Sequence, residues 1–354
     1  MFRNILIKIL LSPFALLYGL AISVIYFSYD IGLLKSSRFS IPVIGIGNLS
    51  MGGAGKTPHV EYLIELLKDY INVATLSRGY KRRTSGFRFV THEDTALTAG
   101  DEPVQYRRKY KDILVAVAES RAYAIPAMIR QYPDIQVILL DDAFQHRSVQ
   151  PGLNIMLTPY DSMFYDDYLL PAGRLREWRS GYRRADIIIV SKCPETISSS
   201  DREEIISKIK PLNHQQVYFT RYRYADPYDF YDNFSRISLD GTQDVILLSA
   251  IANTDYLLSY LDHKVKSIIE IEYEDHHVFD TYDIDRILRT HREHSGRPVI
   301  LTTEKDAVRL EMHKETLKKH NIPVYVLPVQ VKFHFDESKK FDAAIKDFLL
   351  SFEV

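Results

Sequence analysis

The chain has one cysteine and one tryptophan among its 354 residues, and it carries almost no net charge. Because a single cysteine, Cys193, cannot form an internal disulfide, the sequence excludes a disulfide-stapled fold and favours a reducing compartment. A formal net charge of −1 argues against a protein dedicated to nucleic acids, which needs an excess of Lys and Arg to contact the phosphates. The sequence also lacks internal repeats and low-complexity tracts. We therefore expect an intracellular globular protein with no nucleic-acid partner.

Length and composition predict two domains. With 46% hydrophobic and 26% charged residues, the chain can bury a substantial core, and single cores stop growing beyond about 250–300 residues. The stretch 224–232 is rich in Tyr and Asp and contains Pro227, a composition typical of a linker. We predict an N-terminal membrane-associated helix in residues 1–35, a first α/β domain in residues 36–223 and a second, smaller α/β domain in residues 233–354.

An apolar run without charged residues, from Ile9 to Phe27, stands near the start of the chain. It is just long enough to cross a bilayer as a helix, and Lys8 and Lys35 flank it. Pro13 and Gly19 interrupt it, so a helix that dips into one leaflet fits as well as one that crosses. A buried core helix has a similar composition, whereas a cleaved signal peptide is disfavoured because no A-x-A tripeptide is present. The run thus predicts an apolar membrane helix and leaves its depth open.

Short apolar strands alternate with helical stretches in the rest of the chain, which is typical of a doubly wound α/β sheet. In the first domain the expected strands are 73–76, 113–118, 137–140, 153–157 and 187–190. In the second domain they are 245–248, 268–273, 298–302 and 324–329.

A glycine-rich loop stands between a strand-like run, residues 41–47, and an amphipathic helix. The loop consists of Gly52, Gly53, Ala54, Gly55, Lys56 and Thr57. In such loops the glycines let backbone N–H groups surround a polyphosphate, the lysine reaches the β/γ oxygens and the hydroxyl ligates Mg²⁺. The strict Walker pattern has Gly where this chain has Ser50, so a chance glycine turn is the alternative. The flanking strand and helix favour a P-loop NTPase-like nucleotide site.

A second chemical signal is the apolar strand 137–140, which ends in Asp141 and Asp142. Walker B strands end in this way, with an Asp near Mg²⁺ at the carboxyl edge of the sheet. A buried strand followed by a helix-capping Asp has the same pattern, so this signal is weak when taken alone. Together with the glycine loop, the two carboxylates predict a metal-supporting role, and the sequence leaves open which of them performs it.

Three further polar clusters have both a chemical and a structural interpretation. In residues 100–103, Asp101 can be a general base for a hydroxyl nucleophile, or it can cap a helix. Residues 274–277 lack the i, i+4 His spacing of a helical zinc site. A His oriented by a carboxylate is the better chemical interpretation there, and surface histidines are the alternative. Residues 169–177 mix loop residues with charges, which predicts a mobile substrate loop.

The motifs form an ordered series along the chain. Its segments are Gly47-Asn48-Leu49, Gly52-Gly53-Ala54-Gly55-Lys56-Thr57-Pro58, Ser77-Arg78-Gly79-Tyr80, Gly100-Asp101-Glu102-Pro103, Asp141-Asp142-Ala143-Phe144-Gln145-His146-Arg147, Leu170-Pro171-Ala172-Gly173-Arg174-Leu175-Arg176-Glu177, Asp275-His276-His277 and Thr303-Glu304-Lys305-Asp306-Ala307-Val308. This series resembles tetraacyldisaccharide 4′-kinase, the lipid A 4′-kinase of Gram-negative bacteria, over nearly the whole chain. Departures are mild: Ala143 stands where the family usually has Gly, and Arg174 and Trp178 occupy positions that we expect to vary.

The resemblance implies a membrane-associated kinase with two α/β/α domains. It implies transfer of the γ-phosphoryl group of ATP, with Mg²⁺, to the 4′-hydroxyl of a tetraacylated glucosamine disaccharide 1-phosphate, which forms lipid IVA. The catalytic domains would lie on the cytoplasmic face of the bacterial inner membrane. The family analogy makes Asp101 the catalytic base and His276 its partner from the second domain, which would couple catalysis to closure over ATP. It also carries over Arg176 and Glu177 as site residues whose roles stay open, while Lys56 of the glycine loop supplies charge neutralisation for the transfer.

Two other functions compete with this interpretation. The first is a membrane-attached P-loop nucleotide switch, either a GTPase or an ATPase. Guanine readers usually carry Asn/Thr-Lys-x-Asp after a strand, whereas residues 191–194 read Ser-Lys-Cys-Pro and lack the Asp. The second is a lipid-binding scaffold with a decayed nucleotide site, which is disfavoured because Lys56, Thr57 and Asp142 are all present.

Overall fold

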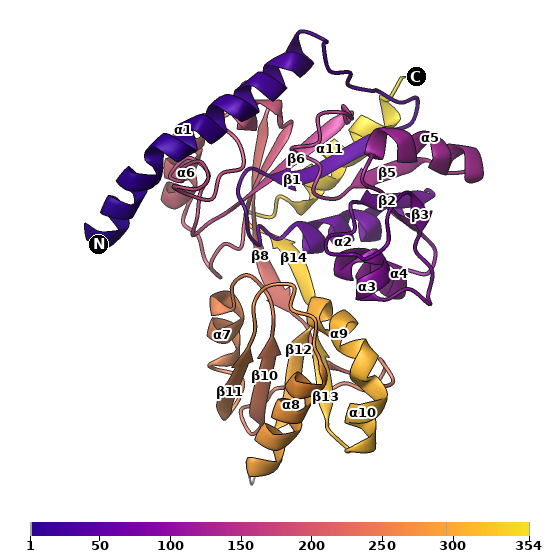
Figure 1. Cartoon of the computed structure of the whole chain (residues 1–354), viewed down its shortest axis with the longest axis vertical. Helices are drawn as coiled ribbons and strands as arrows, with labels where there is room; N and C mark the ends of the chain where they lie inside the picture. The colour runs from indigo at the N-terminus through magenta and orange to yellow at the C-terminus, as the bar shows by residue number, and fades with distance from the viewer. Residues whose placement is uncertain (1, 295, 354) are drawn as a thin grey trace.

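The protein consists of a long N-terminal helix and two α/β units, each built on its own sheet (Figure 1). The computed structural model describes residues 2–294 and 296–353. A nine-stranded sheet forms the first unit and a five-stranded sheet forms the second. This arrangement confirms the predicted fold class, a doubly wound sheet with a smaller α/β unit and an apolar N-terminal helix.

The first sheet is parallel except at its two edges. Its strand order is β14-β8-β7-β6-β1-β5-β2-β4-β3, and the edge strands β14 and β3 run antiparallel to their neighbours. The strands are β1 (Val43–Asn48), β2 (Val73–Ser77), β3 (Arg88–Phe89), β4 (Leu114–Val117), β5 (Val137–Leu140), β6 (Leu153–Pro159), β7 (Ile187–Ser191), β8 (Gln216–Tyr224) and β14 (Val329–Phe333). The helices are α2 (Lys56–Leu67), α3 (Ala96–Ala99), α4 (Asp101–Lys109), α5 (Arg121–Gln131), the 3₁₀ helix η1 (Arg179–Arg184), α6 (Ser199–Ile209) and α11 (Ser338–Leu350).

Apolar side chains of β1 enter cores on both faces of this sheet, which is why the strand reads as a continuous apolar run. Ile44 and Ile46 pack with Ile64 of α2 on one face. Val43 packs with Ile125 of α5 on the other face. Because α2 and α5 pack against opposite faces of β1, the strand is held in place, and the loop that follows it begins at the carboxyl edge of the sheet.

The second unit has a sheet of order β11-β10-β12-β13-β9. Its strands are β9 (Tyr228–Asp229), β10 (Asp244–Ser249), β11 (Ser267–Glu272), β12 (Val299–Thr303) and β13 (Val324–Leu327). Its helices are α7 (Asp255–Leu261), α8 (Thr281–Glu293), α9 (Glu304–Leu310), the 3₁₀ helix η2 (Glu311–His313) and α10 (Lys314–Lys319). Because β10, β11 and β12 are parallel, the loop before α8 and the start of α9 lie at the same edge of the sheet.

The C-terminal segment returns to the first unit, whereas the sequence predicted that residues 233–354 would form the second domain. β14 pairs with β8 of the first sheet (Figure 1). Phe341 and Ile345 of α11 are buried in the core beside α2. The physical reason is that the apolar face of α11 covers β-sheet surface that the first unit leaves open. The predicted linker also differs, because it contains β9, which pairs with β13.

Helix α1 (Phe2–Asp30) runs along the outside of the first unit (Figure 1). Its face with Ala15, Tyr18, Gly19 and Ser23 is turned toward the protein, at the i, i+3 and i+4 spacing of one helical side. The segment from Ile7 to Asp30 has a mean hydropathy of 2.0, yet only 11% of its apolar window is buried. The helix is therefore apolar on a side that the rest of the chain does not cover.

Candidate active site

The glycine loop lies at the carboxyl edge of the first sheet, between the end of β1 and the start of α2. Gly52 and Gly55 have φ angles of 104° and 84°, in the left-handed region that favours glycine. A Cβ on Gly55 would also lie 2.5 Å from the hydroxyl of Tyr222. Since β5 is the parallel neighbour of β1, Asp141 and Asp142 emerge at the same edge as the loop. The two sequence motifs are thus adjacent in space.

Lys56 points back toward the end of β1. Its Nζ lies 3.1 Å from Oδ1 of Asn48 and 3.4 Å from Oδ1 of Asp142. Arg176 reaches the same place from the loop after β6, and its Nη2 donates to Asn48 Oδ1 at 2.7 Å and to Asp142 Oδ1 at 3.0 Å. Although burial opposes ionisation, Lys56 and Arg176 hold the pKa of Asp142 well below its usual range. Two cations therefore converge on one ionised carboxylate beside the phosphate loop.

Asp141 has a different environment from that of Asp142. It is buried, its Oδ2 accepts a hydrogen bond of 2.9 Å from the hydroxyl of Tyr106, and its Oδ1 has no partner among the described residues. Burial, followed by the charges of Glu102 and Asp142, raises the pKa of Asp141. The Thr57 hydroxyl is oriented toward Glu102, with 3.4 Å between the oxygens. An unsatisfied buried carboxylate oxygen is a group that a bound cation would satisfy.

Mg²⁺ fits this donor set without a preformed cage. Residues 2–294 and 296–353 contain no group of three or more His, Cys, Asp or Glu residues that could hold a metal ion by themselves. Mg²⁺ is commonly held by one or two protein oxygens together with substrate phosphates and water. Thr57 and Asp141 offer such oxygens near Lys56, so the site suits a metal that arrives with a nucleotide.

Asp101 and His276, which are 175 residues apart, meet between the two units. Nδ1 of His276 lies 2.8 Å from Oδ2 of Asp101, which begins α4, and Arg309 Nε lies 3.6 Å from the same oxygen. The φ angles of Gly100 and His276, 93° and 60°, are both positive and turn the chain sharply before these side chains. Burial opposes ionisation of Asp101, but the hydrogen bond to His276 and nearby cations hold its pKa below the usual range. The carboxylate is therefore ionised near neutral pH.

Glu177 follows Arg176 but points elsewhere. It is 1% exposed, and its carboxylate accepts hydrogen bonds from Gln145 Nε2 at 2.8 Å and from Arg184 Nη2 at 2.7 Å. Gln145 Nε2 also donates to the backbone oxygen of Asn48 at 2.9 Å. Glu177 thus ties its loop to the end of β1 instead of facing the space around Lys56.

Several groups at the site were not identified from the sequence. Asn48 ends β1, and its Oδ1 accepts hydrogen bonds from both Lys56 and Arg176. A polar residue at the carboxyl end of a buried strand is a sequence feature that could have identified it as a site residue. Lys305 belongs to a motif noted above without an assigned role. Tyr106 and Arg121 had no recognisable pattern in the sequence. Both contact Asp141 only through packing: the Tyr106 hydroxyl donates to Oδ2 of Asp141, and Arg121 Nη2 donates to its backbone oxygen at 2.9 Å.

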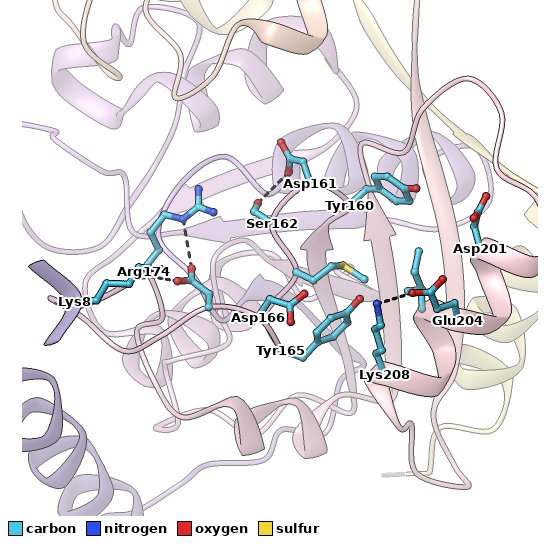
Figure 2. A pocket seen from close by; sticks show the side chains of 13 residues that line it. Lys8, Tyr160, Asp161, Ser162, Tyr165, Asp166, Arg174, Asp201, Glu204 and Lys208 are labelled. Carbon is cyan, nitrogen blue, oxygen red and sulfur yellow. Dashed lines mark hydrogen bonds and ion pairs between the residues drawn. The ribbon is translucent and has the colours of Figure 1, made fainter. Parts of the chain in front are cut away.

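A separate cavity of about 440 Å³ lies beside the N-terminal part of α1 (Figure 2). Three cations, Lys8, Arg174 and Lys208, line it together with five carboxylates, those of Asp161, Asp166, Asp167, Asp201 and Glu204. It contains none of the predicted site residues. Because carboxylates repel a polyphosphate, this cavity is a poor nucleotide site despite its size.

Comparisons with known proteins agree with the geometry. The model of the LpxK family, described as tetraacyldisaccharide-1-P 4′-kinase, matches residues 7–350. The chain is 41% identical over 343 residues to tetraacyldisaccharide 4′-kinase from Bacteroides fragilis strain YCH46, covering 95% of this chain and 91% of that protein. It is 41% identical over 348 residues to the Flavobacterium johnsoniae protein of that name, covering 98% of each. A crystal structure of Aquifex aeolicus LpxK in complex with ATP superposes with a TM-score of 0.73 at 27% identity, covering 97% of this chain and 99% of that one.

Proposed function

This chain belongs to the tetraacyldisaccharide-1-P 4′-kinase family, and we propose that its active site is the place where residues 50–57, residues 141–142 and the pair Asp101–His276 converge. It is an ATP-dependent kinase that transfers the γ-phosphoryl group to the 4′-hydroxyl of tetraacyldisaccharide 1-phosphate, which gives lipid IVA for lipid A. A nucleotide switch is not favoured, because the 41% identity extends over 95% of the chain and not over the glycine loop alone.

We assign Lys56 and Arg176 to the phosphates of ATP. Phosphoryl transfer requires mainly alignment and neutralisation of charge on the transferred group. The contacts of both cations with Asp142, at 3.4 Å and 3.0 Å, support this assignment, because they hold two positive charges beside the phosphate loop. Asp142 thus positions the cations.

We assign Thr57 and Asp141 to Mg²⁺. The unpartnered Oδ1 of Asp141 supports this assignment, since Tyr106 satisfies only the other oxygen of that carboxylate within the described chain. When bound, the metal supplies charge neutralisation on the phosphate oxygens.

The observation that carries the proposal is the 2.8 Å contact between His276 and Asp101. A sugar hydroxyl is a poor nucleophile at neutral pH, so its attack benefits from a base within reach. As the 4′-oxygen forms its bond to the γ-phosphorus and the bond to ADP breaks, Asp101 accepts the hydroxyl proton. His276 orients the carboxylate. Because Asp101 belongs to the first unit and His276 to the second, the pair forms only when the two units are close together.

The proposal is tested by following the bisphosphorylated lipid formed from ATP and the disaccharide acceptor while Mg²⁺ is titrated. We expect no product after metal removal by a chelator and recovery on adding Mg²⁺. Asp141→Asn should raise the Mg²⁺ concentration for half-maximal rate by at least about 10-fold, because loss of even an outer-shell partner of a metal ligand typically costs about 10- to 100-fold in metal affinity. Asp142→Asn should act mainly on turnover, because its charge positions Lys56 and Arg176.

The two variants serve as matched controls for each other, since each replaces one carboxylate by an amide of equal size. Lipid-independent ATP hydrolysis without transfer to the acceptor would contradict the kinase proposal. Equal shifts in the Mg²⁺ requirement for both variants would contradict the assignment of the metal to Asp141.

We also propose that α1 attaches the enzyme to the cytoplasmic face of the inner membrane and lies along the surface instead of crossing it. Its polar contacts with the first unit support this orientation: Trp178 Nε1 donates to Ser23 Oγ at 2.9 Å, and Arg147 Nη2 lies 2.6 Å from Asp30 Oδ1. A crossing helix of about 43 Å would have to leave these partners. The hydroxyl of Tyr18 also donates to the backbone oxygen of Arg176 at 2.8 Å, so the helix touches the loop that carries a site residue.

Replacing Leu10, Leu17 and Leu20 by Gln should lower partition into liposomes at least about tenfold, because each leucine is 62–72% exposed and contributes roughly 1.5–3 kcal/mol when fully buried in an apolar phase. The apparent KM for lipid acceptor in mixed micelles should rise, while ATP affinity stays unchanged. Flotation, surface-dilution kinetics and nucleotide binding measure these effects. Leu350→Gln, at an 86% exposed leucine of α11, is the matched control. If the triple variant floats with liposomes as the wild type does, the membrane contact lies outside these leucines of α1.

A further inference from the structure

Lys192 brings a second ammonium group to the glycine loop from a different strand. It directly follows β7, and its Nζ lies 3.6 Å from the position that a Cβ on Gly53 would take. Ser191 ends β7, and its hydroxyl donates to the backbone oxygen of Ala54 at 2.8 Å, so the end of the strand is joined to the loop. Residues 191–194 lack the Asp of a guanine reader, so that motif gives the lysine no role.

The ammonium group of Lys192 has no anionic partner in the part of the chain that the structure describes. Its recorded contact is with the ring of Tyr222, whose centre lies 5.9 Å from Nζ. Burial lowers the pKa of Lys192, and the carboxylates of Asp161 and Asp275 oppose this shift without cancelling it. An anion bound beside Nζ would stabilise the charged form of the lysine.

The backbone at Lys192 has an unusual conformation. Its φ angle is 55°, in the left-handed region that residues with a Cβ adopt rarely. Such a conformation persists only where the surrounding structure imposes it, and examples concentrate at binding and active sites. Here the chain turns directly after β7, and the lysine side chain reaches the loop near Gly53.

The order of the strands indicates which part of a nucleotide lies near Lys192. β5, which is followed by Asp141 and Asp142, is the neighbour of β1 on one side, whereas β6 and then β7 follow on the other side. Asp101 begins α4, which packs against β4, and β4 also lies on the β5 side of β1. Transfer requires the γ-phosphoryl group to be near Asp101 and the metal. The rest of the nucleotide therefore extends toward β6 and β7.

We propose that Lys192 is a nucleotide-binding residue that contacts the phosphates of ATP that are not transferred. This inference rests on the proposed function of the glycine loop. Within residues 50–57, Lys56 is the only Lys or Arg, so the loop itself offers one cation to a chain of several negative charges. Lys192 supplies a further point charge on the side of the α- and β-phosphates. Because ADP keeps these phosphates, the same contact holds the product.

The experiment compares Lys192→Met, Lys192→Arg and Lys210→Met in the full-length protein. Met keeps an apolar stem and removes the charge, whereas Arg keeps a cation. Lys210 is the matched control, because it is also a lysine with a positive φ angle, 53°, but it follows α6 on the surface. Should Lys192→Met unfold in a thermal scan, Lys192→Asn replaces it, since Asn tolerates a left-handed φ.

The readouts are kcat and KM for ATP in phosphoryl transfer, and the Kd values of Mg·ADP and of inorganic tripolyphosphate by calorimetry. We expect Lys192→Met to weaken binding of both ligands by about 10- to 100-fold, which is what a hydrogen bond to a charged group contributes. The KM for ATP should rise by a similar factor, and kcat should change less, because the contact is the same before and during the transfer. Lys192→Arg should recover most of the affinity, and Lys210→Met should bind both ligands like the wild type.

The inference is overturned if a folded Lys192→Met binds tripolyphosphate like the wild type while Lys56→Ala does not. A loss of ADP affinity without a loss of tripolyphosphate affinity also contradicts it, because the lysine would then contact the nucleoside. If Lys56→Ala also binds tripolyphosphate normally, the glycine loop is not the phosphate site, and the proposed function fails together with the inference.

Discussion

Replacing Lys56 by Ala is expected to lower kcat for phosphoryl transfer by about 10²- to 10³-fold, or roughly 2.7–4 kcal/mol of transition-state stabilisation. Lys56 begins α2 next to Gly55, and its ammonium group is held by Asn48 at 3.1 Å and Asp142 at 3.4 Å. A cation held in this way neutralises charge on the transferred group without reorganisation during the reaction. Formation of the bisphosphorylated lipid at saturating ATP and acceptor measures the loss.

The fold should survive this substitution, because Asp142 retains its ion pair with Arg176 at 3.0 Å. Thermal unfolding of the variant tests that expectation. Lys68→Ala is the matched control, since Lys68 stands at the other end of the same helix and pairs with Glu65 and Asp69 on the surface. Near-normal turnover by Lys56→Ala would show that the glycine loop is not the phosphate-binding site.

Asp101→Ala and His276→Ala should each lower kcat by about 10²- to 10⁴-fold, and the double variant should be no slower than the slower single variant. The reason is that His276 orients the carboxylate of Asp101 through one contact of 2.8 Å, so either loss disables the same unit. Single-turnover rates for the three variants, measured with saturating Mg·ATP, give the coupling free energy between Asp101 and His276.

His277→Ala is the control for this cycle. His277 is adjacent in sequence, but its Nε2 lies 2.7 Å from Asp283 within the second unit and makes no recorded contact with Asp101 among the described residues. It should retain turnover within a few fold. If the losses at Asp101 and His276 multiply in the double variant, each residue acts alone and the proposed pair is wrong.

The sequence by itself was enough to predict the phosphate loop and its neighbouring carboxylates. Lys56 and Thr57 follow one buried strand, and Asp141 and Asp142 follow another. Once both strands are assigned to a parallel sheet, their carboxyl ends share one edge, and the pairing of β5 with β1 in the structure makes these groups neighbours along that edge. Local chain order and strand periodicity carry that information.

The roles that depend on distant packing were not accessible in this way. Glu177 and Arg176 are consecutive, yet only the folded loop turns one toward Gln145 and Arg184 and the other toward Asp142. The return of residues 329–350 to the first unit likewise depends on which sheet edge and which apolar face are left open. No local pattern distinguishes these outcomes.

The sequence determined the class of chemistry, because a phosphate loop and a Walker B carboxylate are local features of strands and turns. The tertiary structure alone decided the partners of Asp101, which are His276 at 2.8 Å and, through that ring, Lys305 at 3.1 Å. Asp101 belongs to the first unit, and His276 and Lys305 belong to the second, so their distances follow from how the two units pack, including the contact of α4 with α9. Contacts of this kind depend on how the two units pack against each other, and a linear sequence motif does not predict that packing.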